Sequence, residues 1–189
     1  MKTTLGEITH IRFGVHAPKL KKGKVHYLVS SHFNEENQPA FLKDSFIELP
    51  EDKLDKYLLQ PNDVVLTGKG QRLFAWAYHP KYGRIVPSSV FYILRTNPAL
   101  VNGTYLAAFL NSPKIKHTLE LLGKGATITS IAKKDVQDLK MVLPTIEKQN
   151  KLEKLLKLTE KEINILSGLL KSKKALHKGI INQFLNTTA

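Results

Sequence analysis

The residues best suited to chemistry form a short basic loop, Gly68-Lys69-Gly70-Gln71-Arg72. The glycines on either side of Lys69 allow the backbone to approach a rigid ligand closely. Gln71 and Arg72 can each form paired hydrogen bonds to a base edge, glutamine to adenine and arginine to guanine. The loop does not fit a P-loop, in which four residues separate a glycine from Gly-Lys-Ser/Thr. Two interpretations stay open: a DNA-binding loop that uses Lys69, Gln71 and Arg72, or a basic hairpin turn.

Two further segments suit phosphate oxygens. The first carries four lysines within six residues, Lys19, Lys21, Lys22 and Lys24. In the second, Lys124 lies between two glycines and is followed by the hydroxyl group of Thr127. Contacts of this kind hold a protein on DNA without reading its sequence. We expect phosphate contact from both segments, and the alternative for each is a solvated loop or turn.

No group of residues predicts catalysis. The chain has no cysteine, which excludes disulfides, thiol nucleophiles and cysteine-ligated zinc or iron–sulfur centres. Its seven histidines are scattered without a His-Glu-x-x-His pair, and no serine occupies a Gly-x-Ser-x-Gly turn. The acidic residues around Pro50 fit a solvated turn and a helix start. We therefore expect a protein with no catalytic residues, no metal ligands and no cofactor of its own.

The charge of the chain indicates a polyanionic partner. Of its 189 residues, 29 are Lys or Arg and 16 are Asp or Glu, which gives a formal net charge of +13. Apolar residues make up 42% of the chain, as is usual for folded soluble proteins. The excess of positive charge favours nucleic acid over an anionic membrane. Because no stretch has the composition of a signal peptide or a membrane span, we expect a cytoplasmic protein that does not bind membranes.

The candidate loops need a folded scaffold, and the pattern before Pro144 predicts an α+β one, with strands first and helices afterwards. Short β-branched and aromatic runs bounded by Gly or Pro predict strands. These runs cover residues 25–29, 63–67, 73–78, 89–94 and 140–143. Helical spacing begins at Asn102, a second helix is expected from Pro113 to Gly123, and Ser130 is expected to cap a third.

Residues 146–189 form a second predicted domain, a long helix that follows a globular domain of residues 1–145. Apolar side chains recur there at alternating steps of three and four, as in a heptad seam. The seam residues are Leu152, Leu156, Ile163, Leu166, Leu170, Ile180 and Phe184. Thr159, Lys173 and His177 occupy seam positions that should be apolar, so the seam shifts or is interrupted there. A lone helix with such a stripe exposes an apolar face. We expect this face to pack against another chain, and the alternative is packing against its own globular domain.

Several motifs together resemble the specificity (S) subunits of type I restriction–modification systems. In chain order the matching segments are Leu5–Ile8, Gln60–Thr67, Gly123–Ile131, Asp135–Leu139 and Val142–Gln149. The last contains a strand ending in Leu-Pro and then Glu-x-Gln, which opens a long helix in this family. Asn62 stands where the family's central Pro-Gly-Asp motif has glycine.

The resemblance implies a non-catalytic target recognition domain that reads a short half-site in double-stranded DNA. In this family, modification subunits bind S-adenosylmethionine and methylate adenine, and a restriction subunit can also join the complex. A full S subunit has two recognition domains and two helices, whereas this chain has one of each. We therefore expect a homodimer of half-subunits, joined by an intermolecular antiparallel coiled coil, that reads an interrupted palindrome. The alternative is a stand-alone DNA-binding regulator or anti-restriction decoy that does not support methylation.

Overall fold

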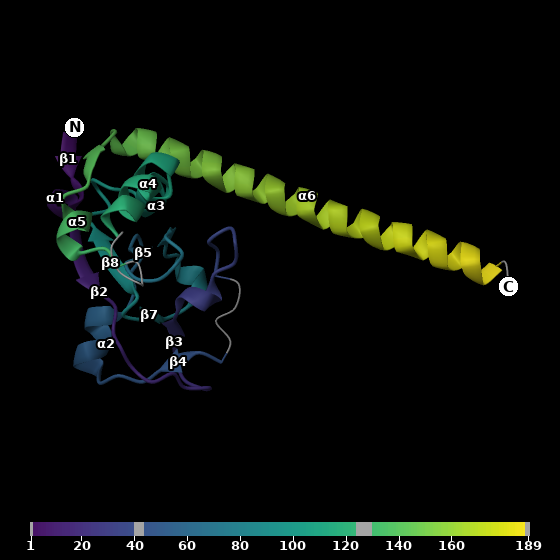
Figure 1. The fold of residues 1–189 in the computed structure, drawn as a ribbon, viewed down its shortest axis with the longest axis horizontal. Coiled ribbons are helices and arrows are strands. Elements are labelled where there is room, and N and C mark those ends of the chain that lie inside the picture. The colour runs from purple at the N-terminus through teal and green to yellow at the C-terminus, as the bar shows by residue number, and fades with distance from the viewer. Residues whose placement is uncertain (1, 40–43, 124–129, 188–189) are drawn as a thin grey trace. The chain divides into compact units, whose positions relative to one another are not determined.

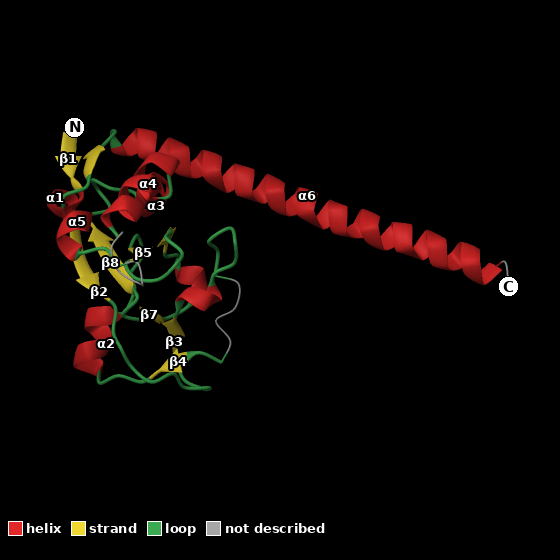
Figure 2. Cartoon of the chain, viewed as in Figure 1, coloured by secondary structure: helices red, strands yellow, loops and turns green. Residues whose placement is uncertain are grey.

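The structure, a computed structural model, describes residues 2–39, 44–123 and 130–187. The chain divides into two units, Met1–Gln149 and Asn150–Ala189. The first is an α+β unit, as expected, and the second consists of a long helix (Figures 1 and 2). The strands are β1 (Lys2–Thr4), β2 (Thr9–Phe13), β3 (Val25–Leu28), β4 (Phe46–Ile47), β5 (Val64–Thr67), β6 (Ala75–Ala77), β7 (Ile85–Pro87), β8 (Phe91–Thr96) and β9 (Lys140–Val142). The helices are α1 (Leu5–Ile8), η1 (Ser30–His32), α2 (Glu51–Tyr57), η2 (Pro80–Tyr82), α3 (Gly103–Leu110), α4 (Pro113–Leu122), α5 (Lys133–Gln137) and α6 (Ile146–Thr187), where η marks a 3-10 helix.

A four-stranded antiparallel sheet, in the order β2-β8-β5-β6, lies at the centre of the globular unit. Side chains alternate between the two faces of a strand. Val64 and Leu66 accordingly pack into a core with helices α3, α4 and α5, whereas Val65 packs into a second core on the other face. That second core includes Leu28 and Ile85 from the smaller sheet β4-β3-β7. Burial on both faces explains why the central strands are apolar without interruption.

The turn before β5 depends on Asn62. Its φ of +74° lies in the left-handed region, which asparagine tolerates better than most side chains. The side chain also joins this turn to the start of α3, because its Oδ1 accepts a hydrogen bond from Gly103 N at 2.6 Å. The next residue, Asp63, is buried and pairs with Arg95, whose Nη2 lies 2.7 Å from Oδ2. Asparagine thus meets the backbone requirement of glycine and adds a tertiary contact.

The predicted strands and helices form, with shifted bounds for some of them. The strand expected at 89–94 is β8, which starts and ends two residues later, at Phe91–Thr96. Asn102 caps α3 by accepting a hydrogen bond from Tyr105 N at 3.0 Å. The prediction that Ser130 caps the third helix is wrong. Helix α5 begins at Lys133, and Ser130 instead forms a β-bridge with Lys69.

The two ends of the globular unit are paired with each other. Strand β1 pairs antiparallel with β9, in a register that aligns Lys2 with Val142. Leu5 N donates a further hydrogen bond to Leu139 O at 2.9 Å. The N-terminal strand therefore lies beside the strand that precedes α6 (Figure 1).

One buried side chain, Gln149, holds the first turn of α6 in this unit. Its exposed fraction is 0%. Its Nε2 donates hydrogen bonds to Leu100 O at 3.0 Å and to Pro144 O at 2.9 Å, and its Oε1 accepts one from Asn102 N at 2.9 Å. The amide thus connects the start of α6 to the loop before α3.

We expect Gln149→Leu to lower the free energy of unfolding of the globular unit by about 2–5 kcal/mol, because a buried amide with three hydrogen bonds is replaced by a side chain that makes none. Asn164→Ala, a change at an exposed position of α6, is the control and should alter this free energy by no more than about 0.5 kcal/mol. Urea denaturation compares the two variants with the parent protein. Equal midpoints for all three would show that Gln149 does not stabilise the unit.

Candidate nucleic-acid interface

The loop Gly68–Arg72 connects two antiparallel strands, β5 and β6, so the predicted hairpin is present. Neighbouring segments hold its first residues. Gly68 N donates a hydrogen bond to Val90 O at 2.8 Å, and Gly68 O accepts one from Ile131 N at 2.9 Å. The base of the loop is therefore fixed by the segments at Val90 and Ile131, while the side chains of Lys69, Gln71 and Arg72 are exposed.

The two glycines of this loop are required for different reasons. A Cβ atom on Gly68 would lie 2.4 Å from Cε2 of Tyr92, so any larger residue would collide with a buried ring. At Gly70 there is space for a side chain, but a φ of +118° is strained for any residue with a Cβ. The glycines thus let the loop pack on Tyr92 and then turn sharply.

An exposed aromatic ring lies beside the loop. Phe13, 42% exposed, packs on Tyr92 with ring centroids 4.4 Å apart, and Lys69 Nζ lies 5.9 Å from the centroid of Phe13. The hydroxyl of Tyr92 donates a hydrogen bond to Ile131 O at 2.6 Å. Burial, aided by the charge of Asp135, raises the pKa of Tyr92 to about 12, so this donor keeps its proton at neutral pH. A cation next to an exposed ring suits nucleotides, which offer both a phosphate and a flat base.

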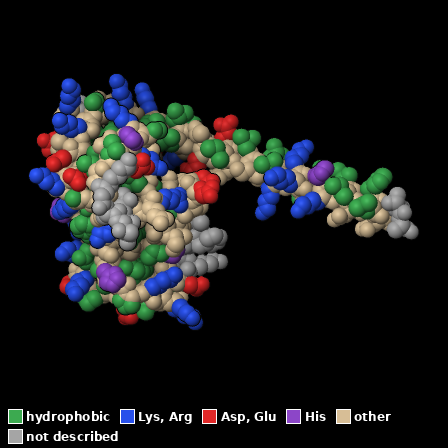
Figure 3. Space-filling model, in the orientation of Figure 1, with side chains coloured by type: hydrophobic (Ala, Val, Ile, Leu, Met, Phe, Trp, Pro, Cys, Tyr) green, Lys and Arg blue, Asp and Glu red, His purple; other side chains and the backbone are tan. Residues whose placement is uncertain are grey.

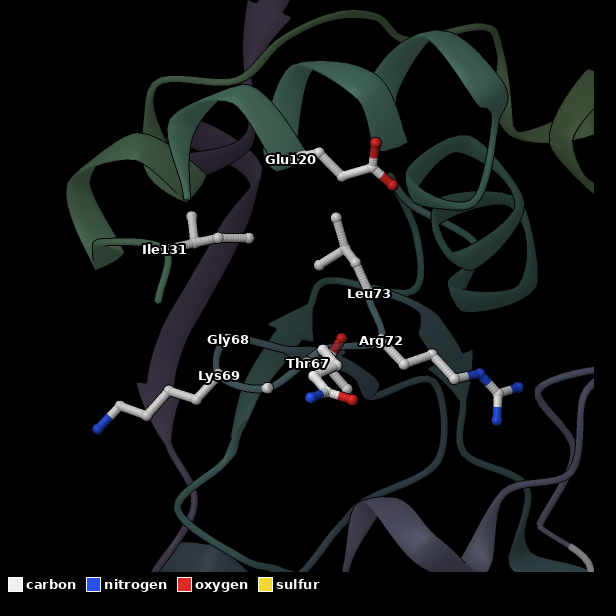
Figure 4. Close-up of a pocket in the computed structure, with 9 residues that line it drawn as sticks. Thr67, Gly68, Lys69, Arg72, Leu73, Glu120 and Ile131 are labelled. Atoms are coloured by element: carbon white, nitrogen blue, oxygen red, sulfur yellow. The ribbon is translucent and has the colours of Figure 1, made fainter. Parts of the chain in front are cut away.

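A cleft of about 260 Å³ opens along the loop (Figure 4). Lys69 and Arg72 extend to opposite sides, and Glu120 of α4 lies across the opening. The lining residues are Thr67, Gly68, Lys69, Gly70, Gln71, Arg72, Leu73, Glu120 and Ile131. A carboxylate in this wall repels phosphate but can accept a hydrogen bond from the amino group of cytosine. The cleft therefore combines a carboxylate that can bind a base edge with the cationic side chains of Lys69 and Arg72, which attract phosphate.

The guanidinium of Arg72 is bound within the protein. Its Nη1 donates to Phe33 O at 3.2 Å, and its Nη2 donates to Asn34 O and, at 2.6 Å, to Asn37 Oδ1. The group also lies 5.1 Å from the ring centroid of Phe74. Bidentate contact with guanine through these nitrogens would require the bonds to segment 33–37 to break. The structure therefore favours Arg72 as a residue that positions this segment, which the sequence pattern did not reveal.

The lysine-rich segment, residues 19–24, comes near His32, which precedes the residues that Arg72 contacts. Lys19, Lys21, Lys22 and Lys24 are exposed in the connection between β2 and β3. Hydrogen bonds of 2.9 Å in both directions between the backbones of Leu20 and Phe46 hold this connection. Burial lowers the pKa of His32, and the nearby charge of Lys19 lowers it further. Because Arg72 contacts Phe33, the residue after His32, the fold brings Lys19 and Arg72, one residue from each predicted basic segment, near residues 32–33.

Lys124 and Thr127 lie outside the described residues, so their expected phosphate contacts stay predictions. In Figure 3, Lys and Arg side chains are spread over the visible face of the globular unit rather than gathered in one patch. In the described parts of the chain, no cluster of three His, Asp or Glu residues could hold a metal ion. No helix among the same residues is both long and apolar enough to cross a membrane.

Comparison with known proteins gives matches only among solved structures, since no protein-family model and no curated protein matches. One match is the S subunit of a type I restriction–modification system from M. genitalium, at 15% identity over 90% of this chain, with a TM-score of 0.63. The HsdS subunit from Thermoanaerobacter tengcongensis matches at 18% identity over 88%, with a TM-score of 0.57. A third chain, from a study of complex assembly and conformational transition in a type I system, matches at 19% identity over 88%, with a TM-score of 0.58.

The TM-scores, between 0.57 and 0.63, establish the fold alone, which is the one that the sequence motifs predicted. The chain has the fold of type I S subunits over a match that covers most of its length. It spans only 41%, 38% and 39% of the lengths of the three matched chains.

The different surroundings of Gln71 and Arg72 predict different effects of mutation on DNA binding. Arg72→Ala should weaken binding to all sequences alike and increase hydrogen exchange in residues 33–38, because it releases the segment that Arg72 holds. Gln71→Ala should leave exchange unchanged and cost about 1–3 kcal/mol of discrimination at one base pair. Selection from a randomised duplex library and amide exchange measure these effects. A change of base preference in Arg72→Ala with unchanged exchange would identify Arg72 as a base-reading residue instead.

Proposed function

We propose that this chain is the DNA-recognition half of a type I specificity subunit, which binds double-stranded DNA and directs a modification subunit without carrying catalytic residues. One observation carries the proposal: the chain shares the fold of S subunits over about nine-tenths of its length. The motifs at Leu5–Ile8, Gln60–Thr67 and Val142–Gln149 point independently to the same family.

Charge and exposure support DNA as the ligand. The net charge of +13 attracts phosphates, and the lysines of residues 19–24, together with Lys69, are exposed where they can reach them. In this proposal those lysines contact the backbone, whereas Gln71 and the cleft at Glu120 contact base edges. Separating these roles explains why one protein needs both a strongly basic surface and a cleft with an acidic wall.

Helix α6 supports pairing between two copies of the chain. Its seam residues from Leu156 to Phe184 are exposed, and the exposed fraction reaches 56% at Ile163 and 69% at Phe184 (Figure 3). A helix with such a face needs a covering surface. We propose that a second copy supplies it, so that two recognition units act together as the two halves of a longer subunit.

The other partners follow from this role. A modification subunit would bring S-adenosylmethionine and methylate adenine, and a restriction subunit could join the same complex. The third matched structure is described as showing complex assembly of a type I system, which supports partners of this kind. This chain would contribute the choice of DNA sequence.

Coexpression with a type I modification subunit in a host free of adenine methylation should give methylation at an interrupted palindrome. Two identical recognition units related by a two-fold axis read the same half-site in opposite directions. Sequencing that detects methyladenine identifies the motif, and cells that carry the modification subunit alone are the control. A non-palindromic motif would reject the homodimer. DNA binding without any methylation would support the regulator or decoy instead.

Pairing through the seam predicts that Leu166→Asp separates the copies, because it buries an unpaired charge at a cost of about 3–5 kcal/mol. The dissociation constant should rise by at least about 100-fold. Asn164→Asp is a matched control, since it introduces the same charge about 200° around the helix from Leu166. Light scattering over a range of concentrations measures the mass. A dimer of unchanged stability in Leu166→Asp would show that this seam does not mediate pairing.

A further inference from the structure

The seam of α6 has an internal symmetry that specifies how two copies would pair. Each seam position before Gly168 has a counterpart the same number of residues after it. The mirrored pairs are 152 with 184, 156 with 180, 159 with 177, 163 with 173, and 166 with 170. In an antiparallel pair of identical helices with its two-fold axis at the level of Gly168, each of these residues meets its mirror residue in the other copy.

Four of the five mirrored pairs match in polarity. Three pairs are wholly apolar: Leu152 with Phe184, Leu156 with Ile180, and Leu166 with Leu170. The polar residues Thr159 and His177, which interrupt the seam in a single chain, meet each other. One pair is mixed, Ile163 with Lys173, and a lysine at a helix interface can extend its charged end to water. Two of the three interruptions, Thr159 and His177, thus meet each other when the seam is read in both directions.

Other registers match less well. A shift of one heptad in either direction places Thr159 opposite Leu170 or opposite Phe184, so a polar residue meets an apolar one. A parallel pair in register places Lys173 opposite Lys173 of the second copy, and His177 opposite His177. Like charges at a helix interface are destabilising. The antiparallel register about Gly168 is therefore favoured over these alternatives.

The charges of α6 favour the same arrangement. Its acidic residues, Glu147, Glu153, Glu160 and Glu162, all precede residue 163, and residues 163–189 carry lysines but no acidic residue. Antiparallel pairing brings the half that holds the four glutamates, together with five lysines, beside the half whose only charged side chains are lysines. In the register about Gly168, Glu160 flanks the seam beside Lys174 of the other copy. Within one straight helix these two residues lie 14 positions, or about 21 Å, apart and cannot touch.

From these observations we propose that two copies of this chain pair antiparallel through α6, with the two-fold axis at Gly168, Thr159 against His177, and Glu160 beside Lys174. This inference rests on the proposed homodimer and adds its register. The first residues of the two helices, Ile146 in each copy, then lie 44 residues apart along the pair, or about 66 Å. That separation fixes the distance between the points at which the recognition units attach.

Charge reversal tests the proposed contact between Glu160 and Lys174. Glu160→Lys and Lys174→Glu should each raise the dissociation constant of the dimer roughly 5–30-fold at low salt, because each places like charges together at two symmetric points. The double variant should return to within about twofold of the parent protein. Sedimentation equilibrium at low and high salt measures these constants. Failure of the double variant to rescue the single ones would overturn the contact.

Cysteine cross-linking tests the register directly, because the chain has no cysteine of its own. A mixture of Leu156→Cys and Ile180→Cys proteins should form cross-linked dimers with a short bismaleimide. Leu156→Cys alone should not, since its two copies would be about 36 Å apart. Ser167→Cys alone should cross-link to itself, because it lies at the two-fold axis. Efficient self-cross-linking of Leu156→Cys would show a parallel pair and overturn the register.

The outcomes separate this inference from the proposed function. A parallel or shifted dimer that still directs palindromic methylation overturns only the register. A protein that stays monomeric at high concentration overturns both the register and the homodimer. The expected cross-links in a protein that neither binds DNA nor supports methylation would retain the register and reject the role in DNA recognition.

Discussion

The buried amide of Gln149 is the contact on which the architecture depends. It satisfies backbone groups before α3 and after β9 with one side chain, and so holds the first turn of α6 within the globular unit. A shorter or apolar residue would leave these three hydrogen bonds unmade. Because α6 carries the seam and the globular unit carries the basic loops, the amide connects the start of the helix for which we propose pairing to the unit for which we propose DNA contact.

The candidate interface combines a rigid base with accessible side chains. Gly68 is packed on Tyr92, and the backbone of the loop is bonded to the segments at Val90 and Ile131. Arg72 donates hydrogen bonds to Phe33 and Asn37 and so holds residues 33–37 beside the loop. Side chains such as Lys69 and Gln71 thus stand on a backbone whose position is set by the core. A site that must distinguish bases benefits from such preorganisation, since less order has to be gained on binding.

Local patterns in the sequence identified five of the nine strands that the structure describes and the helices from α3 to α6. Apolar runs identified β3, β5 and β8, and seam periodicity identified α6. The features that the sequence did not predict depend on partners that are far away along the chain. Strand β1 has only three residues and forms because it pairs with β9. Ser130 has the residue type of a helix cap, but it forms a β-bridge with Lys69 instead.

The same limitation applied to the candidate site. Arg72 was predicted to be accessible to DNA because its type and charge suggested it, yet its neighbours Phe33 and Asn34 are nearly forty positions away. Phe13 gave no signal that would separate an exposed ring from a buried one. For Gln149 the Glu-x-Gln motif did provide a signal, although only the structure shows what its amide binds. Residue type predicted which groups could bind DNA, and tertiary contacts decided which of them remain available.

The pairing of β1 with β9 has a consequence for how longer proteins of this fold can arise. In the antiparallel arrangement that we propose about Gly168, the end of one α6 near Thr187 would lie level with Gln149 of the other copy. Gln149 belongs to the unit in which Lys2 is paired with Val142, so the tail of one polypeptide comes near the head of the other. If two such genes were fused in tandem, a short connecting peptide could join the two copies without altering either fold. The two halves of the fused product would be free to diverge and to read unlike half-sites, and a chain more than twice as long would retain the symmetry of its ancestor.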